Sequence, residues 1–179
     1  MNSSIRASEA GMPSRQQDSV APFGQDSLPV LEFTCQGQRF AVPLSCVRRA
    51  VLSAHPSPLP GAIEIVLGVL NVGGDTVTVL DFARRAGCAP TVIDPTQQFL
   101  IVDLGGFLCA LVVDSIIGPA TAARAGGGWP GAAGVADFVD GALQLPDGLC
   151  LVIDPARFLF AHEQEQLAQA LAGASRGRH

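Results

Sequence analysis

The chain contains neither lysine nor tyrosine, and charged residues make up only 15% of its 179 residues. A phosphate-loop lysine, a Schiff-base lysine and a tyrosine general acid are therefore excluded. All 11 basic residues are arginine and the net charge is −5, which argues against a protein that binds nucleic acid. So few charges cannot cover a folded surface, and we expect apolar surface to contact a partner.

Cysteine is present but without a pairing pattern. The five cysteines are an odd number with no Cys-x-x-Cys motif: Cys35, Cys46, Cys88, Cys109 and Cys150. Four lie in apolar runs, where a free thiol behaves as a small hydrophobic side chain. Neither a signal peptide nor a run of about 18 apolar residues is found. We therefore expect a cytoplasmic protein with reduced thiols and no membrane insertion.

Motifs that would indicate catalysis or ligand binding are missing or lack their context. The three histidines are scattered along the chain, so no metal site is expected. Residues 126–131 match Gly-x-Gly-x-x-Gly but lack the flanking strand and helix of a dinucleotide site, which favours a loop. Trp129 in this loop either anchors it on the core or marks a contact surface. No cofactor is expected, and Asp81 and Asp154 are better explained as helix caps than as paired acids.

Short strands joined by glycine turns dominate the chain after a polar start. Residues 1–28 are predicted to form a disordered tail. Four hairpins are predicted over residues 30–42, 65–80, 99–113 and 142–153. Helices are predicted from Ser45 through Val51, over 82–86, and over 155–172 ahead of a flexible tail at 173–179.

The hairpins form two copies of one unit. Residues 78–84 (Thr-Val-Leu-Asp-Phe-Ala-Arg) resemble residues 151–157 (Leu-Val-Ile-Asp-Pro-Ala-Arg), and nearly the same offset separates the turn glycines Gly37 and Gly106. Short strands without long intervening helices favour small barrels over a βαβ sheet. The sequence therefore predicts a mainly β protein of two similar barrels, over roughly 29–88 and 97–154.

The order of these pieces resembles the CheW-like domain of bacterial chemotaxis adaptors. The most specific stretch is Gly68-Val69-Leu70-Asn71-Val72-Gly73-Gly74, and weaker matches occur at residues 40–44, 58–61, 111–118 and 138–141. The resemblance covers about Val30 to His162. It implies a domain over 29–172 in which two five-stranded, SH3-like barrels pack together, with short helices and a C-terminal helix.

The resemblance also implies a non-catalytic scaffold. Such domains couple the cytoplasmic tip of a methyl-accepting chemoreceptor to a CheA-type histidine kinase. The partner-binding face that it implies consists of Val47, Arg48, Arg49, Val69, Asn71, Gly73 and Gly74. This chain departs from the family at three positions. Gly73 stands where the family usually has Arg, Arg49 where it usually has Glu, and Thr78 where it usually has Pro. Charges of this kind set partner choice, which suits a specialised array such as one that controls twitching or biofilm formation.

Two other functions stay open from the residues themselves. One is an adaptor in a two-component pathway outside chemotaxis. The other is a small cysteine-dependent redox enzyme that uses Cys46 or Cys88, the latter near the Arg84-Arg85 pair. Adjacent arginines are more often solvated surface, although arginine also favours protein interfaces. Thiol reactivity discriminates the redox enzyme from the adaptors.

Overall fold

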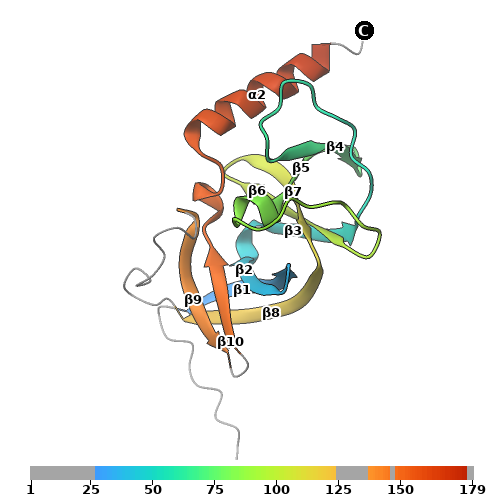
Figure 1. The fold of residues 1–179 in the computed structure, drawn as a ribbon. Coiled ribbons are helices and arrows are strands. Elements are labelled where there is room, and N and C mark those ends of the chain that lie inside the picture. Colours follow the sequence, from blue (N-terminus) through green and yellow to red (C-terminus); the bar gives the residue numbers. More distant parts are fainter. Residues whose placement is uncertain (1–26, 124–136, 146–147, 177–179) are drawn as a thin grey trace, which may run out of the picture.

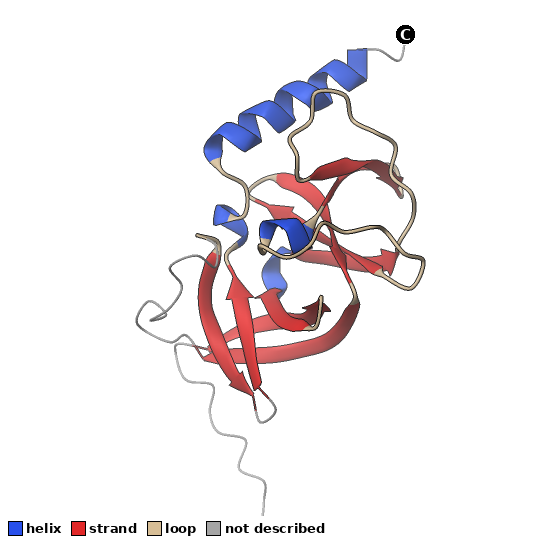
Figure 2. Cartoon of the chain, in the orientation of Figure 1, coloured by secondary structure: helices blue, strands red, loops and turns tan. Residues whose placement is uncertain are grey.

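The computed structural model describes residues 27–123, 137–145 and 148–176. Within these ranges the chain is mainly β, with two five-stranded sheets and few helices (Figure 2). The first sheet has the order β8-β1-β2-β10-β9, built from β1 (Ser27–Cys35), β2 (Gln38–Pro43), β8 (Ser115–Ala123), β9 (Val139–Leu145) and β10 (Gly148–Ile153). The second has the order β3-β6-β7-β5-β4, built from β3 (Val47–Leu52), β4 (Val66–Val72), β5 (Asp75–Leu80), β6 (Gln98–Leu104) and β7 (Phe107–Val113). Figure 1 shows the second sheet above the first, with helix α2 (Ala161–Arg176) at the top.

The four predicted hairpins are confirmed, but the sheets are not closed barrels. No ladder joins the two edge strands of either sheet within the described ranges. In the second sheet the outer edge of β4 is already used by the preceding loop. The backbone N–H groups of Ser57 and Val69 donate to each other's carbonyl oxygens at 2.9 and 2.8 Å. Because these groups of β4 are satisfied by the loop, β3 is left as a separate edge strand.

The two sheets arise by exchange between the two copies of the repeat. The β1–β2 hairpin of the first copy joins the β9–β10 hairpin of the second through a parallel ladder between β2 and β10. In the same way, β6–β7 joins β4–β5 through a parallel ladder between β5 and β7. Each sheet therefore contains one hairpin from each copy. The predicted subdomains 29–88 and 97–154 consequently do not coincide with the sheets.

Strand side chains alternate between a large shared core and a smaller core within each sheet. On β6, Leu100 and Val102 enter the large core, to which both sheets contribute, while Phe99 and Ile101 enter a second cluster. On β2, Phe40 enters the large core and Ala41 a third cluster. Strands buried on both faces need apolar residues at consecutive positions, which explains their continuous apolar runs.

The helix predicted from Ser45 is wrong. Residues Leu44–Cys46 form one 3₁₀ turn, and β3 follows directly, with Val47 opposite Val102 and Val51 opposite Phe99 of β6. Two β-branched residues at i and i+4 fit either structure locally. Pairing with β6 decides the outcome, because it satisfies the free edge of that strand. Strand β8 occupies the matching place beside β1 in the first sheet, where the sequence pattern indicates no strand.

The predicted N-terminal tail is two residues too long, and the predicted C-terminal helix is interrupted. Strand β1 begins at Ser27, so Ser27 and Leu28 pair with β8 instead of belonging to the tail. At the other end, the helix predicted over 155–172 is broken into a 3₁₀ turn, Pro155–Arg157, and α2. Phe158 and Leu159 lie between them and are buried, so the chain leaves the helical path to bring both into the core.

Helix α2 runs through Gly173 to Arg176 and does not stop before the glycine. A glycine inside a helix costs only about 1 kcal/mol relative to alanine, which the rest of the helix offsets. Along the described parts of the chain, no helix combines the length and the apolar character needed to cross a membrane.

Candidate functional site

The β4–β5 turn is the most family-specific part of the sequence, and its residues act on one another. The Asn71 side-chain oxygen accepts a hydrogen bond from the Gly74 N–H at 2.9 Å. Gly73 and Gly74 have φ angles of 67° and 98°, in the left-handed region that glycine tolerates best. Asn71 and Gly74 therefore shape the turn.

Arg49 reaches this turn from the opposite edge of the sheet. Its Nη2 donates a hydrogen bond to the Val72 carbonyl oxygen at 2.7 Å. Strands β3 and β4 are the two edges of their sheet, so an arginine side chain connects edges that share no ladder. A Cβ atom on Gly73 would lie only 3.0 Å from that Nη2 atom. The two departures from the family pattern, Arg49 and Gly73, are therefore in contact.

Arg48, the neighbour of Arg49, has a carboxylate partner. Its Nη2 lies 3.2 Å from Oδ2 of Asp103 on β6. The Gly106 N–H also donates to Asp103, at 2.8 Å, and this bond, followed by that from Arg48, lowers the pKa of the Asp103 carboxyl. Sequence reasoning missed Asp103. A signal exists, because Asp103-Leu-Gly-Gly repeats the turn pattern of Asn71-Val-Gly-Gly.

These side chains border a groove of about 660 Å³ on the second sheet. Its lining consists of Arg48, Arg49, Gly73, Asp75, Ile101, Asp103 and Leu108. Two arginines and two aspartates form its polar rim, over the apolar side chains of Ile101 and Leu108. We call it the Arg49 groove. It gathers three of the seven residues predicted for the partner-binding face.

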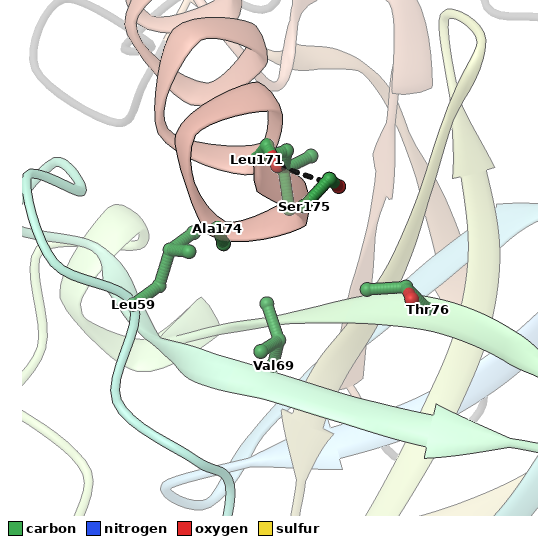
Figure 3. Close-up of a pocket in the computed structure, with 6 residues that line it drawn as sticks. All are labelled: Leu59, Val69, Thr76, Leu171, Ala174 and Ser175. Atoms are coloured by element: carbon green, nitrogen blue, oxygen red, sulfur yellow. Dashed lines mark hydrogen bonds between the residues drawn. The ribbon is translucent and has the colours of Figure 1, made fainter. Parts of the chain in front are cut away.

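Asn71 and Gly74 belong to the turn that carries Gly73, whereas Val47 and Val69 do not line the groove. Val47 is half-buried and packs against the large core. Val69 lines a separate pocket of about 320 Å³ between β4, β5, the preceding loop and α2 (Figure 3). The pocket is lined by Leu59, Val69, Thr76, Leu171, Ala174 and Ser175. The Ser175 hydroxyl donates a hydrogen bond to the Leu171 carbonyl oxygen. The predicted face is thus divided between two sites.

Helix α2 is held over this second pocket by a buried ion pair. Arg85, at the end of helix α1 (Phe82–Arg85), pairs with Glu163 in the first turn of α2, and both side chains are largely buried. The Arg85 guanidinium also lies 4.8 Å from the ring centre of Phe160. Leu167 is fully buried in the large core. The first two turns of α2 are thus anchored on α1 and in the large core. This anchoring places the C-terminal end of α2 beside β4.

The cysteines do not form a reactive centre. All five are free thiols, and burial raises the pKa of Cys46 to about 11. Cys46 Sγ instead donates to the Pro43 carbonyl oxygen at 3.0 Å. The two arginines near Cys88 are engaged, since Arg84 pairs with Glu64 and Arg85 with Glu163. These contacts disfavour a thiolate nucleophile at Cys46 and leave no free guanidinium to stabilise one at Cys88.

We expect Cys46 to react slowly with iodoacetamide in the folded protein. With a pKa of about 11, only about one thiol in a thousand is ionised at pH 8, compared with roughly a quarter of ordinary cysteines. The alkylation rate, followed by mass spectrometry, should therefore rise about tenfold per pH unit from pH 7 to 9 without a plateau. The urea-unfolded chain is the control and should react faster. A plateau below pH 9 in the folded protein would contradict the raised pKa.

Two further sequence predictions concern ligands. In the part of the chain that the structure describes, no three His, Cys, Asp or Glu side chains group closely enough to hold a metal ion. The glycine-rich segment 126–131, with Trp129, lies outside the described residues.

Comparison with known proteins identifies the fold and the family. The structure is similar to the crystal structure of the scaffolding protein TtCheW from Thermoanaerobacter tengcongensis, with a TM-score of 0.67 and 17% sequence identity. The match covers 76% of this chain and 94% of that one. No curated protein matches the chain. A family model for the CheW-like domain matches residues 29–163, which is most of the chain, and the chain therefore belongs to the CheW-like domain family.

Proposed function

We infer that this protein is a non-catalytic adaptor that couples the cytoplasmic tip of a methyl-accepting chemoreceptor to a CheA-type histidine kinase. Family membership and the CheW fold support a scaffold or adaptor role in chemotaxis. The proposal places the protein in the cytoplasm, where both partners would be accessible. The observation that carries it is the Arg49 groove, whose exposed charged side chains surround an apolar floor. A polar rim around an apolar centre is typical of protein interfaces.

An adaptor in a two-component pathway outside chemotaxis is the second candidate. The contact between Arg49 and Gly73 favours it, because both residues depart from the family pattern at one place. Charge changes at an interface rim alter which partners are rejected. The redox enzyme is the weakest candidate, since the Cys46 thiol is held protonated by burial.

Binding to both partners tests the adaptor proposal. The full chain is titrated calorimetrically with the CheA-type kinase and, separately, with a fragment of the chemoreceptor tip, both from the same genome. We expect binding in both titrations and a ternary complex in size-exclusion chromatography. Binding to the kinase but to no chemoreceptor would favour the second candidate. Binding to neither would contradict both.

A further inference from the structure

We propose that the Arg49 guanidinium binds a carboxylate side chain of the partner protein, and that the bare Gly73 turn is what allows it to do so. This inference rests on the proposed adaptor function and adds to it a specificity-determining residue and the chemistry that this residue recognises. Three features of the Arg49 groove carry it: the guanidinium is held in place, it has no carboxylate of its own, and its surroundings suit an acidic side chain.

The guanidinium is fixed by the β4–β5 turn. One Arg49 nitrogen, Nη2, donates to the Val72 carbonyl oxygen at 2.7 Å. The position that a Cβ atom of Gly73 would occupy lies 3.0 Å from Nη2, 3.4 Å from Nη1 and 3.7 Å from Cζ. The guanidinium therefore lies close beside Gly73, and even a Cβ there would make it shift by a few tenths of an ångström. A guanidinium held in advance loses less entropy when it binds a ligand.

Arg49 also lacks the carboxylate partner that several other arginines of the described chain have. Arg48, Arg84, Arg85 and Arg157 each form an ion pair, whereas within the described residues no carboxylate lies within 4.0 Å of Arg49. Asp103, in the same groove, is engaged by Arg48 and by the Gly106 N–H. A guanidinium has five N–H donors, and one hydrogen bond to a carbonyl leaves most of them available. A carboxylate can accept two of them side by side.

The rest of the groove favours a protein carboxylate over a phosphate. Asp75 and Asp103 line the groove and would repel a dianion more strongly than a single negative charge. Leu108, which is only partly buried, provides apolar contact for the methylene groups of a Glu or Asp side chain. The expected ligand is therefore an acidic residue on the surface of the chemoreceptor tip or of the kinase.

Paired glycine variants separate this contact from general strain in a glycine turn. A Cβ at Gly73 would lie 3.0 Å from Nη2 of Arg49 and make the guanidinium shift, whereas a Cβ at Gly105 meets no atom within 4 Å, and the φ angles of the two glycines are 67° and 66°. We expect Arg49→Ala to weaken binding to the partner by about tenfold or more, as loss of a charge-assisted contact does, and Gly73→Ala, which only shifts the guanidinium, to weaken it by more than about twofold. The Gly105→Ala control, in the β6–β7 turn, should change binding by less than about twofold. In the Arg49→Ala background, Gly73→Ala should have no further effect.

Calorimetry with the receptor fragment and with the kinase measures these affinities, and thermal unfolding checks that each variant is folded. Salt dependence of the wild-type protein gives a measurement that needs no variant, because binding through Arg49 should weaken as ionic strength rises. An Arg49→Glu variant should regain binding when one acidic residue of the partner is changed to Arg. Wild-type affinity of Arg49→Ala for both partners, or equal losses for Gly73→Ala and Gly105→Ala, would overturn the inference and leave the adaptor function standing. Absence of binding by the wild-type protein would overturn both.

Discussion

Replacing Phe82 with alanine is expected to lower the free energy of unfolding by about 3–5 kcal/mol. Phe82 is fully buried at the start of α1 and contacts rings from both sides of the large core. Its ring centre lies 4.8 Å from that of Phe40 on β2 and 5.7 Å from that of Phe158. Two further rings, Phe33 and Phe138, lie at 5.1 and 6.2 Å. Removal of this side chain would leave a cavity where the two sheets meet.

Urea unfolding followed by circular dichroism measures this loss. Phe160→Ala is the matched control, because Phe160 is 39% exposed and contacts mainly Arg85 and His162. Its replacement should cost about 1 kcal/mol, the size of one aromatic–cation contact. Since small domains are stable by only about 5–15 kcal/mol, Phe82→Ala should also raise the unfolded fraction noticeably at 37 °C. A loss for Phe82→Ala no larger than that for Phe160→Ala would show that the sheets do not depend on this ring.

The hairpins and caps could be predicted because their determinants are local. The glycine turns at 37, 73–74 and 105–106 form where the sequence predicts turns and have positive φ, and Asp81 and Asp154 cap α1 and the Pro155–Arg157 turn. The pairing of hairpins is different. Nothing in the local pattern distinguishes β2 beside β10 from β2 beside β5, because both alternatives bury the same apolar faces. Only the parallel ladders between the two copies of the repeat select the exchanged arrangement.

Strand β8 was not predicted, although it holds the same place in the second copy of the repeat as β3 does in the first. In the first copy the segment after the hairpin forms β3, and in the second copy the corresponding segment forms β8. Each adds an edge strand to the sheet of the other copy's hairpin. The alternation of β8 is weak, with Gly118 and Pro119 in its middle. Residues 115–123 therefore become a strand because they pair with β1, and a single sequence does not reveal that pairing.

The sequence names candidate residues one by one and says nothing of how they are arranged in space. Arg49 and Gly73 stand out in the sequence as two separate departures, and their contact joins the two edges of one sheet. Val69 was assigned to the same face, yet α2 returns from the C-terminus to cover it. Helix α2 is anchored by Glu163, which no sequence motif marks as a partner of Arg85. Its buried partner Arg85 comes from a helix 78 positions earlier.

Replacing Asp81 with alanine is expected to have the second large effect, a loss of about 3–4 kcal/mol in the free energy of unfolding, because this buried residue satisfies three part-buried donors at once. Only 1% of this residue is exposed. Its carboxylate accepts hydrogen bonds from the Arg84 N–H at 3.1 Å, the Thr91 N–H at 2.9 Å and the Thr91 hydroxyl at 2.8 Å. It thereby starts α1 and ties the loop before β6 to it. Alanine would leave these donors unpaired.

The repeat supplies the matched control, since Asp154 holds the same place in the second copy but is half-exposed. Its carboxylate accepts from the Ala156 N–H at 2.9 Å and pairs with Arg157, both near solvent. Asp154→Ala should therefore cost only about 1 kcal/mol, as an ordinary helix cap does. Asp81→Asn should fall between the two, because an amide keeps one acceptor but turns N–H groups toward a Thr91 donor. Urea unfolding of the three variants measures the order. Equal losses for Asp81→Ala and Asp154→Ala would mean that capping alone accounts for both, and that the bonds to Thr91 add no stability.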